Sequence, residues 1–220
     1  MSKEIEMKVP FTLNELDNII SIVSGSNNNY FNYIPHEFVK KCDKYYTDVS
    51  DEEMESRVSS GGKVIRIRST GKLPKSAMKF ILSDTKRDFT SVGNESYFTT
   101  KIKRLKDGFE NNIENELLIH DSNTMDACLH DMGYRCWFEK SKYSYGLYIT
   151  CSDRRYHIEI ERVSAKRGNE VKHVWYVEIE NTDSNEADEA TIIADEKAIF
   201  EELGLDPNKV DNRPWVKILE

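Results

Sequence analysis

Like-charged side chains recur two residues apart in six short runs of this 220-residue chain. The acidic pairs are Glu4/Glu6, Glu159/Glu161 and Glu178/Glu180, and the basic pairs are Arg66/Arg68, Lys101/Lys103 and Lys140/Lys142. Because successive side chains of a β-strand alternate between its faces, residues i and i+2 share one face. Carboxylates are the ligands that hard divalent cations prefer, and paired cations bind the oxygens of a polyanion. The pattern therefore predicts a surface that binds metal ions and a polyanion together.

An ordinary antiparallel strand with one solvated face would also show such a run. Glu and Lys are weak strand formers, however, and like charges on one face repel each other. Six repeats sorted by sign therefore favour a functional surface. Charged rows of this kind cannot pack into an apolar core without a large desolvation cost. We expect them to line the water-filled interior of a closed barrel, with their apolar neighbours packed against helices outside.

Length and composition indicate one folded domain over residues 1–220. The charged fraction is 32%, the aromatic fraction is 10% and the formal net charge is -8, with a pI near 5.3. These values argue against intrinsic disorder and against a protein that coats nucleic acid nonspecifically. We therefore expect any polyanion site to be local and enclosed.

Strand-like and helix-like stretches indicate an α+β protein dominated by antiparallel sheet. The predicted strands are 3–9, 39–47, 64–69, one from Phe98 to a turn at Asp107-Gly108, 113–119, 137–144, 145–150, 156–163 and 175–181. The predicted helices are 13–23, 122–132 and 195–203. Residues 48–54 are predicted to form a turn, followed by a hairpin at Gly61-Gly62. Residues 70–97 fit no element, and the tail after Arg213 has room for one short element.

The four cysteines and five histidines have no spacing typical of a metal or redox site. No apolar segment resembles a signal peptide or a membrane span, so we expect reduced thiols, a cytoplasmic location and no membrane partner. His157 is interpreted as a surface residue of a strand, not as a catalytic base.

At these residues the sequence resembles the CYTH superfamily, the triphosphate tunnel metalloenzymes. The resemblance covers nearly the whole chain. The ordered motifs are Glu4-Ile5-Glu6-Met7-Lys8 (ExExK), Tyr45-Tyr46-Thr47-Asp48, Ile65-Arg66-Ile67-Arg68, Thr100-Lys101-Ile102-Lys103, Glu114-Asn115-Glu116, Lys140-Ser141-Lys142, Ile160-Glu161-Arg162-Val163 and Glu178-Ile179-Glu180. Three departures stand out. Lys142 replaces the usual Arg, Glu161 replaces the usual Asp, and residues 69–97 exceed the family spacing, so the third basic row is Lys101/Lys103 or includes Lys79.

The resemblance implies an eight-stranded antiparallel barrel, or tunnel, that needs Mg²⁺ or Mn²⁺ and acts on a triphosphate. The implied reaction is hydrolysis of a phosphoanhydride bond. The implied substrates are inorganic triphosphate, thiamine triphosphate, a nucleoside triphosphate or the triphosphate end of an RNA. A monomer or a homodimer would suit such a small-molecule enzyme.

Each charged row has a chemical role in this interpretation. The metal ligands are predicted to be Glu4, Glu6, Glu116, Glu159, Glu161, Glu178 and Glu180. The phosphate ligands are predicted to be Lys8, Arg66, Arg68, Lys101, Lys103, Lys140 and Lys142. Glu4, Glu6, Lys8 and Glu161 are the predicted catalytic residues. Phosphoryl transfer requires mainly positioning and charge stabilisation, which such a set supplies.

Two other functions use the same residues. An adenylyl cyclase would make cyclic AMP from ATP by attack of the ribose O3′ on the α-phosphate, but the sequence shows no base-recognition motif. A noncatalytic polyphosphate-binding module would not need complete acidic rows, and here the rows are complete.

Overall fold

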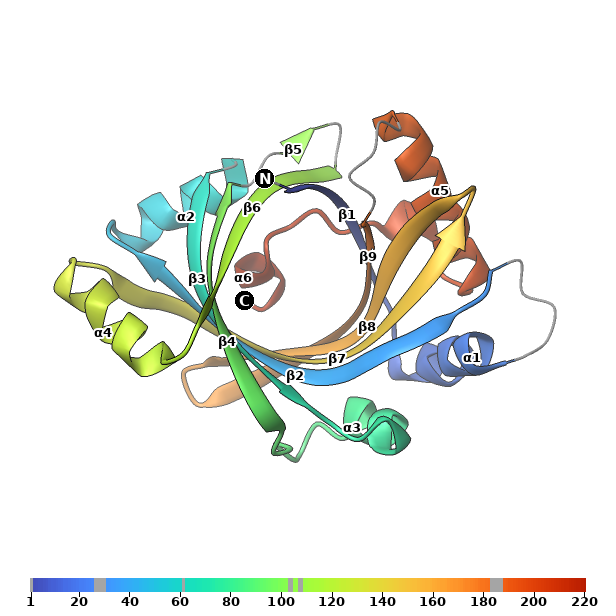
Figure 1. Cartoon of the computed structure of the whole chain (residues 1–220), viewed down its shortest axis with the longest axis horizontal. Helices are drawn as coiled ribbons and strands as arrows, with labels where there is room; N and C mark the ends of the chain where they lie inside the picture. Colours follow the sequence, from blue (N-terminus) through green and yellow to red (C-terminus); the bar gives the residue numbers. More distant parts are fainter. Residues whose placement is uncertain (1, 26–30, 61, 103–104, 107–108, 183–187) are drawn as a thin grey trace.

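Antiparallel strands make up one continuous sheet that closes on itself. The computed structural model describes residues 2–25, 31–60, 62–102, 105–106, 109–182 and 188–220. The strands are β1 (Ser2–Pro10), β2 (Ile34–Thr47), β3 (Lys63–Lys72), β4 (Val92–Ile102), β5 (Leu105–Lys106), β6 (Phe109–Ile119), β7 (Arg135–Cys151), β8 (Arg154–Arg167) and β9 (Glu170–Asn181). Their order is β1-β9-β8-β7-β2-β3-β4-β6-β5, with a further β1–β6 pairing. Eight strands therefore form a closed barrel, and the two-residue strand β5 extends β6 (Figure 1).

The two halves of strand β1 pair with two different strands, and this closes the barrel. Ser2 to Glu6 pair with Glu114 to Glu110 of β6, whereas Glu6 to Pro10 pair with Glu180 to Tyr176 of β9. Antiparallel neighbours on both sides satisfy the backbone donors and acceptors of β1, so the sheet keeps no open edge at this point. The predicted fold class, an eight-stranded antiparallel barrel with helices outside, is confirmed.

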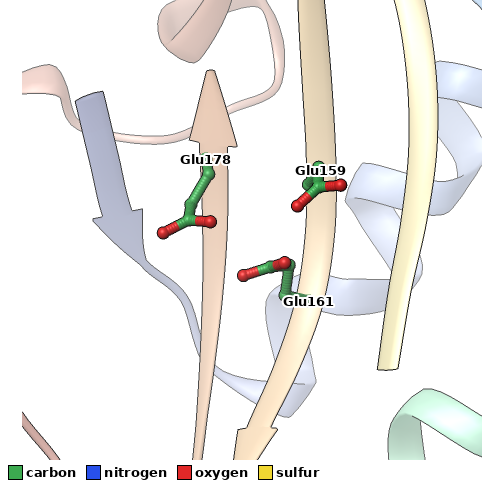
Figure 2. A group of neighbouring side chains, drawn as sticks. All are labelled: Glu159, Glu161 and Glu178. Atoms are coloured by element: carbon green, nitrogen blue, oxygen red, sulfur yellow. The ribbon is translucent and has the colours of Figure 1, made fainter. Parts of the chain in front are cut away.

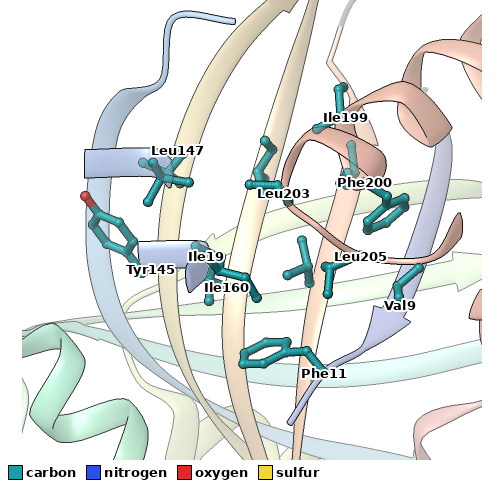
Figure 3. Packing of buried hydrophobic residues seen from close by; sticks show 14 of the residues in the cluster. Val9, Phe11, Ile19, Tyr145, Leu147, Ile160, Ile199, Phe200, Leu203 and Leu205 are labelled. Carbon is teal, nitrogen blue, oxygen red and sulfur yellow. The ribbon is translucent and has the colours of Figure 1, made fainter. Parts of the chain in front are cut away.

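Helices lie outside the barrel and at one end of its interior. Their bounds are α1 (Leu13–Ser24), α2 (Asp51–Ser60), α3 (Met78–Ser83), α4 (Ser122–Asp131), α5 (Glu189–Glu202) and α6 (Trp215–Ile218). Among the described helices, α1, α3, α4 and α5 cover the outer face of the barrel, and α2 and α6 lie at one end of its interior. The main apolar core lies between α1, α3 and α5 and the outward side chains of β1, β7, β8 and β9 (Figure 3). In β1, for example, Ile5, Met7 and Val9 are buried in this core. The residues between them, Glu6 and Lys8, share the opposite face, as the period of two requires.

A second apolar cluster fills one end of the barrel interior. Its strand members Val64, Phe138 and Val163 lie two residues from Arg66, Lys140 and Glu161, on the same strand faces. Met54 and Val58 of α2 and Val216 of α6 pack on them, and Figure 1 shows α6 within the outline of the barrel. The interior is therefore charged along part of its length only, and the expectation of a fully water-filled interior is wrong at this end.

Several predicted elements differ from the observed ones. The predicted turn at 48–54 and hairpin at Gly61-Gly62 are wrong where the chain is described, because Asp51–Ser60 is the helix α2. The predicted strands 137–144 and 145–150 are one strand, β7. The unassigned region 70–97 contains the end of β3, the helix α3 and the start of β4. The predicted turn at Asp107-Gly108 lies outside the described residues.

The sequence predicts that all four cysteines carry reduced thiols. Cys42, Cys128, Cys136 and Cys151 are free. Among the described residues, the longest helices fall short of the length and apolarity that crossing a bilayer requires.

Candidate active site

The barrel encloses a chamber of about 470 Å³. Charged side chains line most of it, and apolar side chains from the second cluster line one end. The lining residues are Glu6, His36, Glu37, Lys41, Tyr45, Val58, Val64, Arg66, Arg68, Lys101, Glu114, Glu116, Trp137, Phe138, Lys140, Lys142, Tyr148, His157, Glu159, Glu178, Glu180, Pro214, Trp215 and Val216. Known ligand pockets span roughly 300–1,000 Å³, so the chamber is large enough for a small ligand.

Three carboxylates from neighbouring strands converge in the chamber wall. Glu159 and Glu161 lie on β8, and Glu178 lies opposite Glu159 on β9. Each residue offers an oxygen, and these oxygens lie within 4.8 Å of one another. Figure 2 shows the three side chains pointing toward a common space. At most 9% of each residue is exposed, so this is a buried acidic cluster.

Burial and mutual repulsion divide the cluster into groups of different acidity. Burial and the nearby Glu178 carboxylate raise the pKa of Glu161 well above its usual value. Burial would also raise the pKa of Glu178, but Lys142 and Lys140 lower it to about 2. Lys41 likewise holds the pKa of Glu159 well below its usual value against the effect of burial. Adjacent carboxylates with opposite shifts are typical of functional sites.

The donor set of this cluster fits a hard divalent cation. Both Glu161 oxygens and Glu178 Oε1 are buried without a hydrogen-bond partner. Lys142 Nζ lies 2.7 Å from Glu161 Oε2, so the two form an ion pair without hydrogen-bond geometry. Buried carboxylate oxygens that accept no hydrogen bond are costly, and Mg²⁺ or Mn²⁺ would satisfy them.

The basic side chains of the chamber are all held by acidic partners. Lys142 Nζ donates a hydrogen bond of 2.5 Å to Glu178 Oε2. Arg66 donates one of 2.7 Å to Glu114 Oε1. Lys101 Nζ lies 3.5 Å from Glu6 Oε2 and 3.6 Å from Glu114 Oε2. The Lys41 ammonium is paired with the Glu159 carboxylate.

Asp43 holds two of these basic groups. The Arg68 guanidinium donates two hydrogen bonds to its carboxylate, of 2.7 and 2.9 Å, and Lys140 Nζ lies 3.3 Å away. Asp43 is 1% exposed. Burial would raise its pKa, but Arg68 and Lys140 hold that pKa well below the usual value. Asp43 therefore orients two cations toward the chamber as a charged carboxylate.

Trp215 closes the chamber at the end occupied by α6. The Nζ atoms of Lys140 and Lys142 lie 4.8 Å from the indole centroid, and Lys8 Nζ lies 5.7 Å from it. An aromatic face attracts such cations. The segment before Trp215 is joined to β1, because the Asp211 amide donates to the Lys8 carbonyl.

Most of the predicted site residues meet in this chamber. Glu6, Arg66, Arg68, Lys101, Glu116, Lys140, Lys142, Glu159, Glu178 and Glu180 line it, and Glu161 and Lys8 are buried beside lining residues. Glu4 lies in β1 opposite Asn112, but its side chain lies outside the described residues, as does Lys103. Lys79 is on α3, where its ammonium pairs with Asp17 outside the barrel. The third basic row is therefore the one that contains Lys101.

Several chamber residues were missed from the sequence. Lys41 and Asp43 are two residues apart on β2 but differ in sign, so a search for like-charged pairs excludes them. His157 is two residues before Glu159 and shares its face, so its interpretation as a surface residue is wrong: it is 9% exposed and lines the chamber. Glu114 could have been included from its spacing to Glu116.

Comparison with solved structures supports the fold. The PH1819 protein of Pyrococcus horikoshii is similar, with a TM-score of 0.65 and 19% identity over 98% of this chain and 97% of that chain. The PH1012 protein of the same organism is similar with a TM-score of 0.59 and 16% identity over 99% of both chains. A candidate adenylate cyclase from Vibrio parahaemolyticus gives a TM-score of 0.56 and 11% identity over 99% of this chain and 97% of that chain. No protein-family model and no curated protein matches the sequence.

Proposed function

We propose that this protein is a metal-dependent triphosphatase that hydrolyses a phosphoanhydride bond of a triphosphate-containing substrate. One observation carries the proposal: the basic side chains and the unsatisfied carboxylate cluster line the same enclosed chamber. A phosphate chain and a hard divalent cation need these two sets of groups at the same place.

The basic residues would bind the phosphate oxygens. Arg66, Arg68, Lys140 and Lys142 come from β3 and β7, which lie on either side of β2, and Lys101 comes from β4. Cations from several strands can contact a phosphate chain from different directions. Without substrate these cations pair with Asp43, Glu114 and Glu178. Phosphate oxygens would compete for the same donors, and the Lys8 ammonium beside Trp215 adds a further charge at the closed end.

The carboxylates would hold the metal. Glu159, Glu161 and Glu178 form the cluster, and Glu4, Glu6, Glu116 and Glu180 are the further ligands that we propose. Bound Mg²⁺ or Mn²⁺ would neutralise phosphate charge and activate a water for hydrolysis. The chain itself would orient the phosphates with its cations and limit the access of bulk water, because α2 and α6 close one end with apolar side chains.

A second candidate is cyclisation of ATP. Among the similar structures is the candidate adenylate cyclase, and cyclisation needs the same metal and phosphate ligands. It additionally needs the nucleoside to be held so that O3′ lies in line with the α-phosphate. Hydrolysis needs no such group, and we therefore prefer the hydrolase.

The test is a comparison of substrates. Purified protein is incubated with inorganic triphosphate, thiamine triphosphate, ATP and triphosphate-ended RNA, each with Mg²⁺, with Mn²⁺ or with chelator, and the products are separated. We expect orthophosphate and the shortened polyphosphate from at least one substrate. Cyclic AMP with an equal yield of pyrophosphate would replace the hydrolase by the cyclase, and undiminished turnover in chelator would exclude a metal-dependent reaction.

A further inference from the structure

A β-bulge places two successive side chains at one wall of the chamber. The pairing of β2 with β7 shifts between Pro35 and Glu37, so that Pro35 lies opposite Leu147 and Glu37 lies opposite Gly146. His36 is the extra residue at this shift. Successive side chains of a regular strand would face opposite sides, yet His36 and Glu37 both line the chamber. Bulges often redirect side chains beside functional sites.

His157 presents an unsatisfied ring nitrogen to the same part of the chamber. Its Nδ1 lies 3.2 Å from Glu180 Oε1. Its Nε2 is buried and has no hydrogen-bond partner among the described residues, although the residue is 91% buried. A histidine that binds a metal through one nitrogen usually donates its other N–H to a carboxylate. The Glu180 contact therefore fixes His157 in the arrangement of a metal ligand.

Gly146 leaves space between His157 and Glu37. A Cβ atom at residue 146 would lie 3.0 Å from His157 Nε2 and 3.3 Å from Glu37 Cγ. One small space is thus bordered by an imidazole nitrogen and a carboxylate side chain, and even a methyl group at residue 146 would fill it. The absence of a side chain at residue 146 therefore leaves this space unfilled.

The second imidazole is within reach of the same space. The ring centroids of His36 and His157 are 6.1 Å apart. Two imidazoles that bind one metal at about 2.0–2.1 Å have ring centres roughly 5–6.5 Å apart. Tyr148 packs against both rings, with centroids at 4.8 and 4.9 Å. The His36 side chain is 45% exposed, so it has freedom to rotate toward a ligand.

The charges nearby suit a dication. Glu37 and Glu180 line the chamber beside the two imidazoles, and the Lys41 ammonium is paired with Glu159. The two carboxylates add negative charge beside the imidazole nitrogens. Imidazole and carboxylate together suit divalent transition metals, whereas Mg²⁺ prefers oxygen ligands alone.

We propose that His36, Glu37 and His157 form a second metal site, which binds a divalent transition-metal ion such as Co²⁺ or Zn²⁺ and is separate from the carboxylate cluster of Glu159, Glu161 and Glu178. This site does not depend on the proposed triphosphatase activity, and its test uses no phosphate substrate.

The test is titration with Co²⁺ alone as the probe, followed by visible absorption and calorimetry, in a large excess of Mg²⁺ that occupies oxygen-only sites. We expect wild type to bind one Co²⁺ ion with the absorption of a nitrogen-containing site. His157→Gln and Gly146→Ala should each weaken binding about tenfold or more. The control His130→Gln, which changes an exposed histidine on α4, should bind like wild type. Glu178→Gln, which changes the carboxylate cluster, shows whether the ion lies there instead.

Three results would overturn the proposal. They are no Co²⁺ binding by wild type, unchanged binding by the His157 and Gly146 variants, and loss of binding in Glu178→Gln, which would place the ion at the carboxylate cluster. Circular dichroism verifies that each variant is folded. If either inner variant fails to fold, His36→Asn decides, because this exposed side chain can be replaced without disturbing a core. It should lower Co²⁺ affinity, and an affinity equal to that of wild type would refute the site.

Discussion

Asp43→Asn should destabilise the protein and make its stability depend strongly on a bound polyanion. The Asp43 carboxylate, which is 1% exposed, accepts two hydrogen bonds from Arg68 and pairs with Lys140. An asparagine keeps the shape of the side chain but removes its charge. Arg68 and Lys140 would then remain buried in the chamber wall without this counter-charge.

The expected magnitude follows from the burial of the pair. Removing one partner of a buried ion pair typically costs about 3–5 kcal/mol, whereas an exposed pair contributes about 0–1 kcal/mol. For a chain of this length, 1 kcal/mol corresponds to roughly 2–4 °C in Tm, so Asp43→Asn should lower Tm by roughly 6–20 °C. Triphosphate would supply negative charge in place of Asp43. A ligand at 100 times its Kd adds about 2.7 kcal/mol, so it should restore a large part of the loss.

Thermal unfolding with and without triphosphate and Mg²⁺ measures both effects. Asp51→Asn is the matched control, because it removes an exposed carboxylate that pairs with Arg135 on the surface. The reasoning is refuted if Asp43→Asn is as stable as Asp51→Asn. It is also refuted if triphosphate raises the Tm of Asp43→Asn no more than that of wild type.

Three further predictions concern single side chains. Glu178→Gln should lower metal-dependent turnover by orders of magnitude, and it should also lower Tm because Lys142 and Lys140 lose a buried counter-charge; a wild-type rate would argue against the metal cluster. Arg66→Ala should weaken triphosphate binding by about 1–3 kcal/mol in calorimetry, and unchanged affinity would remove Arg66 from the phosphate ligands. Burial opposes ionisation of Asp195, but hydrogen bonds from Tyr156 and Arg154 lower its pKa. Asp195→Asn should therefore lower the free energy of unfolding by about 1.5–3 kcal/mol at neutral pH. In denaturant unfolding, this difference from wild type should shrink as the pH falls below about 3.9, and a difference independent of pH would contradict the assignment.

The barrel could be predicted from the sequence because the charged residues of its inner face recur at every second position along the strands. Glu6, Arg66 and Glu178 lie inside because each alternates with apolar residues that face the outer helices. Length, charge and alternation together allow few other folds, since so many charges need water, partners or a ligand. The same pattern predicts that the carboxylate cluster and most of the basic side chains face the interior, and they line or adjoin the chamber.

The closed end of the chamber could not be predicted in this way. Val64, Phe138 and Val163 continue the inward rows as apolar residues, so charge pairing gives no signal for them. Their cover comes from α2 and from the four-residue helix α6, whose position depends on contacts with residues distant in the sequence. Local patterns do not encode such contacts.

The positions of His36 and Glu37 in the chamber wall could not be predicted from the sequence for a different reason. A bulge changes the register by one residue, so a strict alternation places His36 and Glu37 on opposite faces. The predicted break between Ser144 and Tyr145 is also absent, for another reason. Small residues at 144 and 146 resemble a turn signal, but they are inward positions of the continuous strand β7, where Ser144 is fully buried.

The most direct test of the central claim is ³¹P nuclear magnetic resonance of the protein with inorganic triphosphate, in Mg²⁺ and in chelator. Inorganic triphosphate offers the chamber phosphate charge and nothing else, so the reaction depends on the basic rows and the carboxylate cluster alone. We predict that the triphosphate signals are replaced by orthophosphate and pyrophosphate in equal amounts when metal is present and persist in chelator. Triphosphate signals that neither decrease nor broaden with protein and metal would contradict a chamber built for this chemistry.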